Sequence, residues 1–181
     1  MKYSYLENFS MGVNLERAVR ERGFIKTIKL LNENNINYVV MYGSLLGLIR
    51  EGKLLETDND VDILVHKDDI EKAVEMMKKA AMPMDDDRGN IKRHISDKYG
   101  LIEFYIYEVH DDYLVDLWSA QQAKGRPNYV YRFKKDDILP FQNKNYYGLL
   151  PVSIPRQPEK VLASTYGPSW RIPRGGNDYQ P

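Results

Sequence analysis

Three aspartates at alternate positions, Asp58, Asp60 and Asp62, constrain the fold of this chain more than any other feature of its sequence. The last two interleave with apolar residues up to Val65, an alternation that predicts a β-strand from Asp60 to Val65. Side chains two residues apart on a strand point to the same side, so Asp60 and Asp62 direct two carboxylates to one place. Such charges repel each other unless a cation or a proton intervenes. Because carboxylate oxygens suit Mg²⁺, the strand predicts a metal site.

A Gly-Ser pair, Gly43 and Ser44, precedes the aspartates. It follows an apolar and aromatic run that predicts a strand from Ile36 to Tyr42. The pair predicts a turn into a short helix that ends near Arg50. Backbone N–H groups in such a turn bind phosphate oxygens, and glycine lets a ligand approach closely. A guanidinium also suits phosphate, so the segment predicts phosphate contacts from Gly43, Ser44 and Arg50.

The charge balance and the lack of cysteine exclude several other kinds of site. Lysine and arginine together number 26, as do aspartate and glutamate, whereas nucleic-acid binders usually carry a basic surplus. No cysteine is present, which excludes disulfides and thiolate zinc sites. No segment approaches the roughly 18 apolar residues of a membrane span, and the N-terminus lacks the apolar region of a signal peptide. We therefore expect a cytoplasmic protein without a membrane span or a nucleic-acid partner.

The rest of the pattern predicts an α+β fold in one domain that covers residues 1–181, a length that suits a single core. Pro140 to Pro155 gives no clear signal. The other predicted elements are a helix from Leu15 to Leu31 with a break at Gly23, a helix that begins near Asp68, an acidic loop at 84–90, a basic turn at 92–94, a strand from Leu101 to His110, a turn at Asp111–Asp112, a returning strand from Tyr113 to Trp118, a polar loop at 121–128, a strand at 129–133 and a helix from Glu159 to Tyr166.

The segment GSLLGLIREGKLLETDNDVDI resembles the signature of the LicD family, which includes the fukutin-related transferases. That signature is G-[ST]-L-L-G-x-x-R, a short spacer and D-x-D-x-D. The segment LVDLW, from Leu114 to Trp118, resembles the strand that carries the third carboxylate of the family. The segment ILPFQNKNYYGLLPVSIPRQPEKVLASTYGPSW resembles its C-terminal run, so the resemblance extends roughly from Leu15 to Pro173. One departure is Glu56-Thr57, where the family usually has Pro-Trp before the first aspartate. This difference affects what the resemblance implies about the donor or acceptor pocket, and not about the metal site.

The resemblance implies a nucleotidyltransferase fold, a small mixed β-sheet flanked by helices. It also implies that Asp116 joins Asp60 and Asp62 as the third ligand of Mg²⁺ or Mn²⁺. Beside the nucleophile, Asp116 would also be placed to take a proton from the acceptor. The alternative for Asp116 is an aspartate satisfied by local hydrogen bonds, because a lone buried carboxylate needs a partner. Asp58 either binds a second metal ion or orients its loop.

By this resemblance the chain is a metal-dependent transferase that modifies cell-surface glycans. It would move phosphocholine or an alditol phosphate from a CDP-linked donor to a glycan hydroxyl. An alternative on the same fold is a nucleotidyltransferase that moves an NMP from an NTP to a small molecule or protein. A third hypothesis is a non-enzymatic binding module, against which the retention of all three carboxylates argues. A calcium loop of the EF-hand type also begins D-x-D-x-D, but its sixth position requires glycine and here is Ile63.

Overall fold

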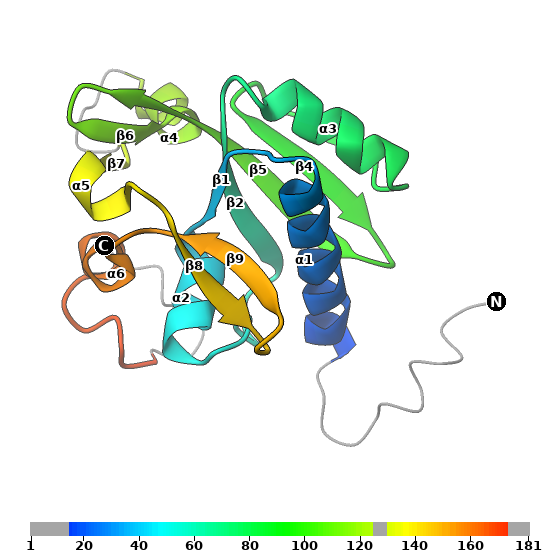
Figure 1. The fold of residues 1–181 in the computed structure, drawn as a ribbon, viewed down its shortest axis with the longest axis horizontal. Helices are drawn as coiled ribbons and strands as arrows, with labels where there is room; N and C mark the ends of the chain where they lie inside the picture. The colour runs from blue at the N-terminus through cyan, green and yellow to red at the C-terminus, as the bar shows by residue number, and fades with distance from the viewer. Residues whose placement is uncertain (1–14, 125–129, 174–181) are drawn as a thin grey trace.

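The computed structural model describes residues 15–124 and 130–173 and has a curled mixed sheet with helices around it (Figure 1). In the sheet, β2 and β5 run parallel to each other, and the other neighbouring pairs are antiparallel. This architecture confirms the expected α+β class. The main strand order is β1 (Tyr38–Val40), β2 (Asp60–His66), β5 (Gly100–His110), β4 (Ile91–Ser96) and β3 (Asp86–Asp87), while β6 (Tyr113–Asp116) pairs with β5 and with β7 (Arg132–Lys134).

Helices surround the sheet, and a separate hairpin lies near β1 and α1 (Figure 1). Within the described residues, none of the helices has the length and apolar character needed to cross a membrane. The helices are α1 (Leu15–Glu33), α2 (Tyr42–Arg50), α3 (Ile70–Lys79), α4 (Leu117–Ala123), α5 (Lys135–Ile138) and α6 (Pro158–Tyr166), and the hairpin consists of β8 (Gln142–Tyr146) and β9 (Leu150–Ile154).

α1 and α2 pack on opposite faces of the sheet. A Cβ placed on Gly23 of α1 would lie 3.2 Å from Ile102 Cδ1, whereas the ring of Tyr42 in α2 contacts that of Tyr105. Since Ile102 and Tyr105 are an odd number of residues apart on one strand, their side chains point to opposite faces. The apolar face under α1 carries part of the core, and the face under α2 carries Asp60, Asp62 and the tyrosines of β5.

The break predicted at Gly23 is wrong. α1 is continuous from Leu15 to Glu33, and a Cβ on Gly23 would lie only 1.9 Å from the carbonyl oxygen of Tyr99. The glycine therefore allows the helix to approach the turn before β5. Phe24 and Ile28 beside it are fully buried, and this packing stabilises the helix against the cost of an internal glycine, about 1 kcal/mol.

Other boundaries differ from the sequence predictions because tertiary contacts decide them. The prediction of a basic turn at 92–94 is wrong. These residues lie in β4, where His94 is 2% exposed and Lys92 forms an ion pair with Asp87. The strand predicted to end at Trp118 ends at Asp116, and α4 follows directly. The unassigned stretch after Pro140 forms the β8–β9 hairpin. The acidic loop at 84–90 contains β3, and the predicted loop at 121–128 and strand at 129–133 lie partly outside the described residues.

Candidate metal and phosphate site

Asp58, Asp60 and Asp62 form a cluster at the start of β2. One carboxylate oxygen from each lies within 4.8 Å of the others, which is close enough for the three to share a cation. Asp60 and Asp62 occupy alternate positions of the strand, as predicted, and Asp58 lies in the loop before it. Asp62 is buried, and its Oδ2 and the Oδ1 of Asp60 are buried oxygens without a hydrogen-bond partner. Two such oxygens aimed at one place fit a divalent cation.

The pKa values of the three aspartates also indicate a site for a cation. Burial and then the charge of Asp58 raise the pKa of Asp60 to about 7. Burial and then the charge of Asp60 hold the pKa of Asp62 well above its usual range. Burial also raises the pKa of Asp58, although contact with Asp60 and the charge of Arg20 oppose that rise. Without a cation, the cluster therefore holds protons that ordinary aspartates would have released.

The raised pKa of Asp60 predicts that the metal-free protein loses stability as pH rises. Between the ordinary value near 3.8 and the folded value near 7, the folded state binds more protons than the unfolded state, so the free energy of unfolding falls across this window. We expect Asp60→Asn to remove a loss on the order of 3 kcal/mol between pH 4.5 and 7.5, because this window spans most of the shift and each pKa unit corresponds to about 1.36 kcal/mol. Denaturant titrations of both proteins in chelator measure the difference. Equal pH dependence in the two proteins would contradict this environment for Asp60.

The first turn of α2 lies directly beside Asp62. The backbone N–H of Asp62 donates to Ser44 Oγ at 2.9 Å, and a hydrogen bond from the Ser44 backbone lowers the pKa of the Asp62 carboxylate. Gly43 and Ser44 belong to the helix itself and not to a preceding turn, because α2 already begins at Tyr42. Backbone N–H groups at a helix N-terminus favour anions. The structure thus brings the predicted phosphate-binding pair next to the predicted metal site.

Tyr42 connects this helix to Asp116. Its backbone has a φ of +49°, a left-handed conformation that is uncommon for a bulky residue. Its hydroxyl donates to Asp116 Oδ2 at 2.7 Å, and its ring contacts that of Tyr105 at a centroid distance of 5.4 Å. Strained residues held by surrounding contacts often mark functional sites, and here the strained residue is the one whose hydroxyl contacts Asp116.

Asp116 lies at the end of β6 and is 1% exposed. One carboxylate oxygen accepts from Tyr42, and the other accepts from the backbone N–H of Trp118 at 2.8 Å, so Asp116 caps α4. Asp116 is not part of the cluster of Asp58, Asp60 and Asp62. Both of its oxygens therefore have hydrogen-bond partners, one local from Trp118 and one from Tyr42, 74 positions earlier in the chain. Its role as a metal ligand or base stays a prediction.

Two substitutions of Asp116 separate its structural role from a chemical one. Asp116→Ala removes a helix cap and leaves the buried Tyr42 hydroxyl without its acceptor, so we expect a loss of about 2–3 kcal/mol in the free energy of unfolding. Asp116→Asn keeps an oxygen for Trp118 and should unfold at nearly the wild-type denaturant midpoint. If Asp116 is a ligand, the Asn variant binds metal more weakly; if it is a base, metal binds but turnover is lost. Normal binding and turnover would leave it a purely structural residue.

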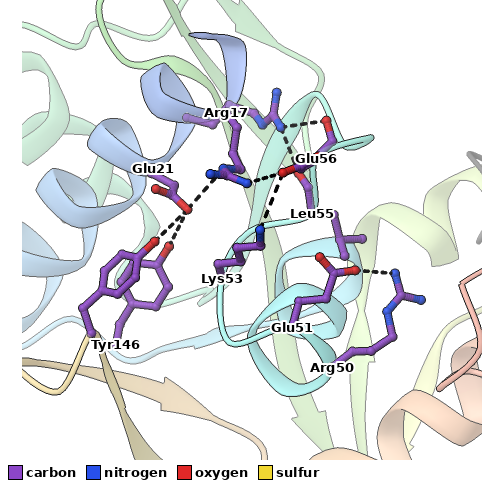
Figure 2. A network of polar contacts seen from close by, with 10 residues as sticks. Arg17, Glu21, Arg50, Glu51, Lys53, Leu55, Glu56 and Tyr146 are labelled. Atoms are coloured by element: carbon purple, nitrogen blue, oxygen red, sulfur yellow. Dashed lines mark hydrogen bonds and ion pairs between the residues drawn. The ribbon is translucent and has the colours of Figure 1, made fainter. Parts of the chain in front are cut away.

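Arg50 lies at the other end of α2 from the aspartates. It follows Ser44 by six residues, roughly 9 Å along a helix axis. Its guanidinium pairs with Glu51 at 3.0 Å, which Figure 2 shows, and donates to the carbonyl oxygen of Trp170 at 3.4 Å. These contacts tie the end of α2 to the segment after α6. Phosphate binding by Arg50 therefore stays a prediction. The side chain would have to bind phosphate in addition to its contacts with Glu51 and Trp170.

Glu103 on β5 is a residue of this site that the sequence analysis missed. It stands opposite Asp62 in the β2–β5 register and is 6% exposed. Its carboxylate accepts from Arg93 Nε and from the Tyr105 hydroxyl, both at 2.7 Å, and its charge further raises the pKa of Asp62. The available signal was an acidic residue within the largely apolar run from Leu101 to His110, which contains two glutamates, Glu103 and Glu108. Its position beside Asp62 depends on the strand pairing, which that run alone does not specify.

The comparisons with known proteins agree with this fold. Residues 35–157 match the family model described as LicD/FKTN/FKRP, nucleotidyltransferase domain. No curated protein sequence matches the chain. One similar solved structure is the lincosamide antibiotic adenylyltransferase LnuA with lincomycin bound, with a TM-score of 0.55 and 16% identity over 75% of this chain and 79% of that one.

The resistance factor ANT(2'')-Ia is also similar. Its solution structure has a TM-score of 0.59 and 9% identity, covering 87% of this chain and 76% of that one. Its crystal structure with adenylyl-2''-tobramycin has a TM-score of 0.55 and 10% identity, covering 83% and 76%. At these identities the likeness shows the nucleotidyltransferase-like fold, and the family match covers more than half of the chain. This chain is therefore a member of the LicD family, a transferase built on a nucleotidyltransferase fold.

Proposed function

We propose that this protein is a metal-dependent transferase that moves a phosphorylated small alcohol, phosphocholine or an alditol phosphate, from a CDP-linked donor to a glycan hydroxyl. The observation that carries the proposal is the cluster of Asp58, Asp60 and Asp62, with two buried unpartnered oxygens beside the start of α2. A polar cluster of this kind is costly unless a ligand satisfies it. The family match gives the class of reaction.

The residues divide into two groups by what they offer a diphosphate. Asp60 and Asp62 would hold Mg²⁺ or Mn²⁺, with Asp58 beside them as a third carboxylate and Asp116 as the further ligand predicted from the sequence. The bound ion would draw negative charge from the diphosphate. The backbone N–H groups of the first turn of α2 would orient phosphate oxygens, which is the positioning that phosphoryl transfer requires. Asp116, held by Tyr42, is the candidate to take a proton from the acceptor.

A second candidate is the transfer of an NMP from an NTP to a small molecule or protein. It is favoured by the fold shared with LnuA, which is an adenylyltransferase, and with ANT(2'')-Ia, whose crystal structure contains adenylyl-2''-tobramycin. The two reactions use the same kind of carboxylate site but break different bonds. The first releases CMP, and the second releases pyrophosphate.

The nucleotide product distinguishes the two candidates. The protein is incubated with Mg²⁺ and a CDP-linked donor, with and without an acceptor glycan, and separately with each NTP and small hydroxyl acceptors. We expect CMP release that depends on the acceptor. Pyrophosphate release from an NTP, with no reaction of any CDP-linked donor, would establish the second candidate in place of the first.

A further inference from the structure

We propose that Arg17 and Arg20 on α1 are positioning residues for the metal site: they hold the α2–β2 loop, residues 51–59, and thereby set the place of Asp58 in the carboxylate cluster. The inference rests on the proposed metal site. α1 precedes the segment that matches the family, so the proposal assigns a role in the site to residues that the match does not include.

Arg20 contacts the backbone of the loop just before Asp58. Its Nη2 donates to the carbonyl oxygens of Leu55 at 2.9 Å and of Glu56 at 3.4 Å. The side chain is 4% exposed, which is rare for an arginine and indicates that these contacts are part of the packed structure. A planar guanidinium with several fixed donors suits two neighbouring carbonyl groups better than an ammonium does.

The fold leaves room for Arg20 at the start of β5. Gly100 has a φ of +74°, and a Cβ placed on it would lie 3.2 Å from Arg20 Cγ. Glycine therefore meets both the backbone conformation and the space that the arginine needs. The same strand then continues to Glu103, opposite Asp62. Arg20 therefore packs between the loop that precedes Asp58 and the start of the strand that carries Glu103.

Arg17 holds the side chains of the same loop. It forms an ion pair with Glu56, and Lys53 approaches Glu56 at 3.5 Å (Figure 2). Arg17 Nε also lies 3.8 Å from Glu21, whose Oε1 accepts from the hydroxyls of Tyr146 and Tyr147 at 3.1 Å each. Glu21 thus links Arg17 to the β8–β9 hairpin, and α1 connects that hairpin to the loop.

Asp58 needs such support because it lies outside the strand that places Asp60 and Asp62. The charge of Arg20 also acts on Asp58 and Asp60. The charge of Arg20 and its positioning of the loop have opposite effects on the affinity of the site for a divalent cation. A nearby arginine repels the cation, so removal of its charge alone would strengthen metal binding, whereas release of the loop would weaken it. The direction of the change therefore decides between the two roles.

The test is Mn²⁺ binding to the metal-free full chain, measured by calorimetry for Arg20→Lys and Arg20→Met. If Arg20 positions the loop, both variants bind Mn²⁺ about tenfold more weakly, the low end of the effect of residues that orient metal ligands. If Arg20 acts only through charge, Arg20→Lys binds as wild type and Arg20→Met binds more tightly, which would overturn the proposal. In an Asp58→Asn background, Arg20→Lys should have no further effect, because the coupling runs through Asp58.

Glu56→Gln keeps the proposal testable if the buried arginine variants do not fold, because the Glu56 side chain is 56% exposed. It removes the partner of Arg17, and we expect up to about fivefold weaker Mn²⁺ binding. Glu75→Gln is the matched control, since Glu75 pairs with Lys79 on the exposed side of α3, and it should bind as wild type. Unchanged binding by every folded variant of Arg20 and Glu56 would overturn this inference alone. No Mn²⁺ binding by the wild type would overturn the proposed metal site as well.

Discussion

Asp62→Asn and Asp60→Asn should each lower transfer by roughly a thousandfold without unfolding the protein. A metal ion contributes several kcal/mol of transition-state stabilisation, and each 1.36 kcal/mol corresponds to a factor of ten in rate. The folded state should remain stable, because the two carboxylates are close together and each has a buried oxygen without a hydrogen-bond partner. A neutral amide removes a repulsive charge, so the melting temperature in chelator should hold or rise. Product release gives the transfer rate, and thermal unfolding of the same preparations gives the melting temperature.

Asp68→Asn is the control for these variants, because Asp68 follows the far end of β2 and its side chain is 76% exposed. It should retain activity and stability. Near-normal turnover by Asp62→Asn would contradict the metal-site assignment, and so would wild-type activity that persists after thorough chelation. A large fall in the apo melting temperature of Asp62→Asn would instead show that its carboxylate is a structural group.

A CDP-linked donor and Mg²⁺ should stabilise the protein together far more than either does alone. The diphosphate and the aspartate cluster carry charge of the same sign, so the donor binds well only when a cation lies between them. A ligand that binds the folded state at about a hundred times its dissociation constant adds roughly 2.7 kcal/mol, which raises the melting temperature of a domain of this size by about 5–10 °C. Thermal unfolding with donor, with Mg²⁺, and with both measures the coupling.

Free choline and ribitol, which lack the diphosphate, should not shift the melting temperature with or without Mg²⁺. In Asp62→Asn the joint effect of donor and metal should disappear, because the variant retains α2 but lacks one of the carboxylates proposed to bind the metal. If the donor raised the melting temperature equally in chelator and in Mg²⁺, the donor would bind without the metal. The donor site and the metal site would then be independent of each other.

The local parts of the site could be predicted from the sequence. The alternation from Asp60 to Val65 has the two-residue period of a strand, and that period alone places Asp60 and Asp62 on one side. The apolar runs on either side of Asp111 and Asp112 predicted the β5–β6 hairpin, because a two-residue turn joins antiparallel strands. The spacing of Gly43, Ser44 and Arg50 before the aspartates carried the family resemblance, which the match over residues 35–157 confirms. These features depend on neighbours within a few residues along the chain.

The remaining features depend on contacts between residues that are distant in the sequence. Glu103 reaches Asp62 only because β5 pairs parallel to β2, and Tyr42 meets Asp116 across 74 positions of the chain. Gly23 remains helical because of the close approach of Tyr99, which outweighs its poor local propensity. Arg20 could not be placed near Asp58 from its own helix, since its partners are carbonyl groups with no signature in the sequence. Local periodicity thus determined the strand and the paired aspartates, while long-range packing decided which other charges surround them.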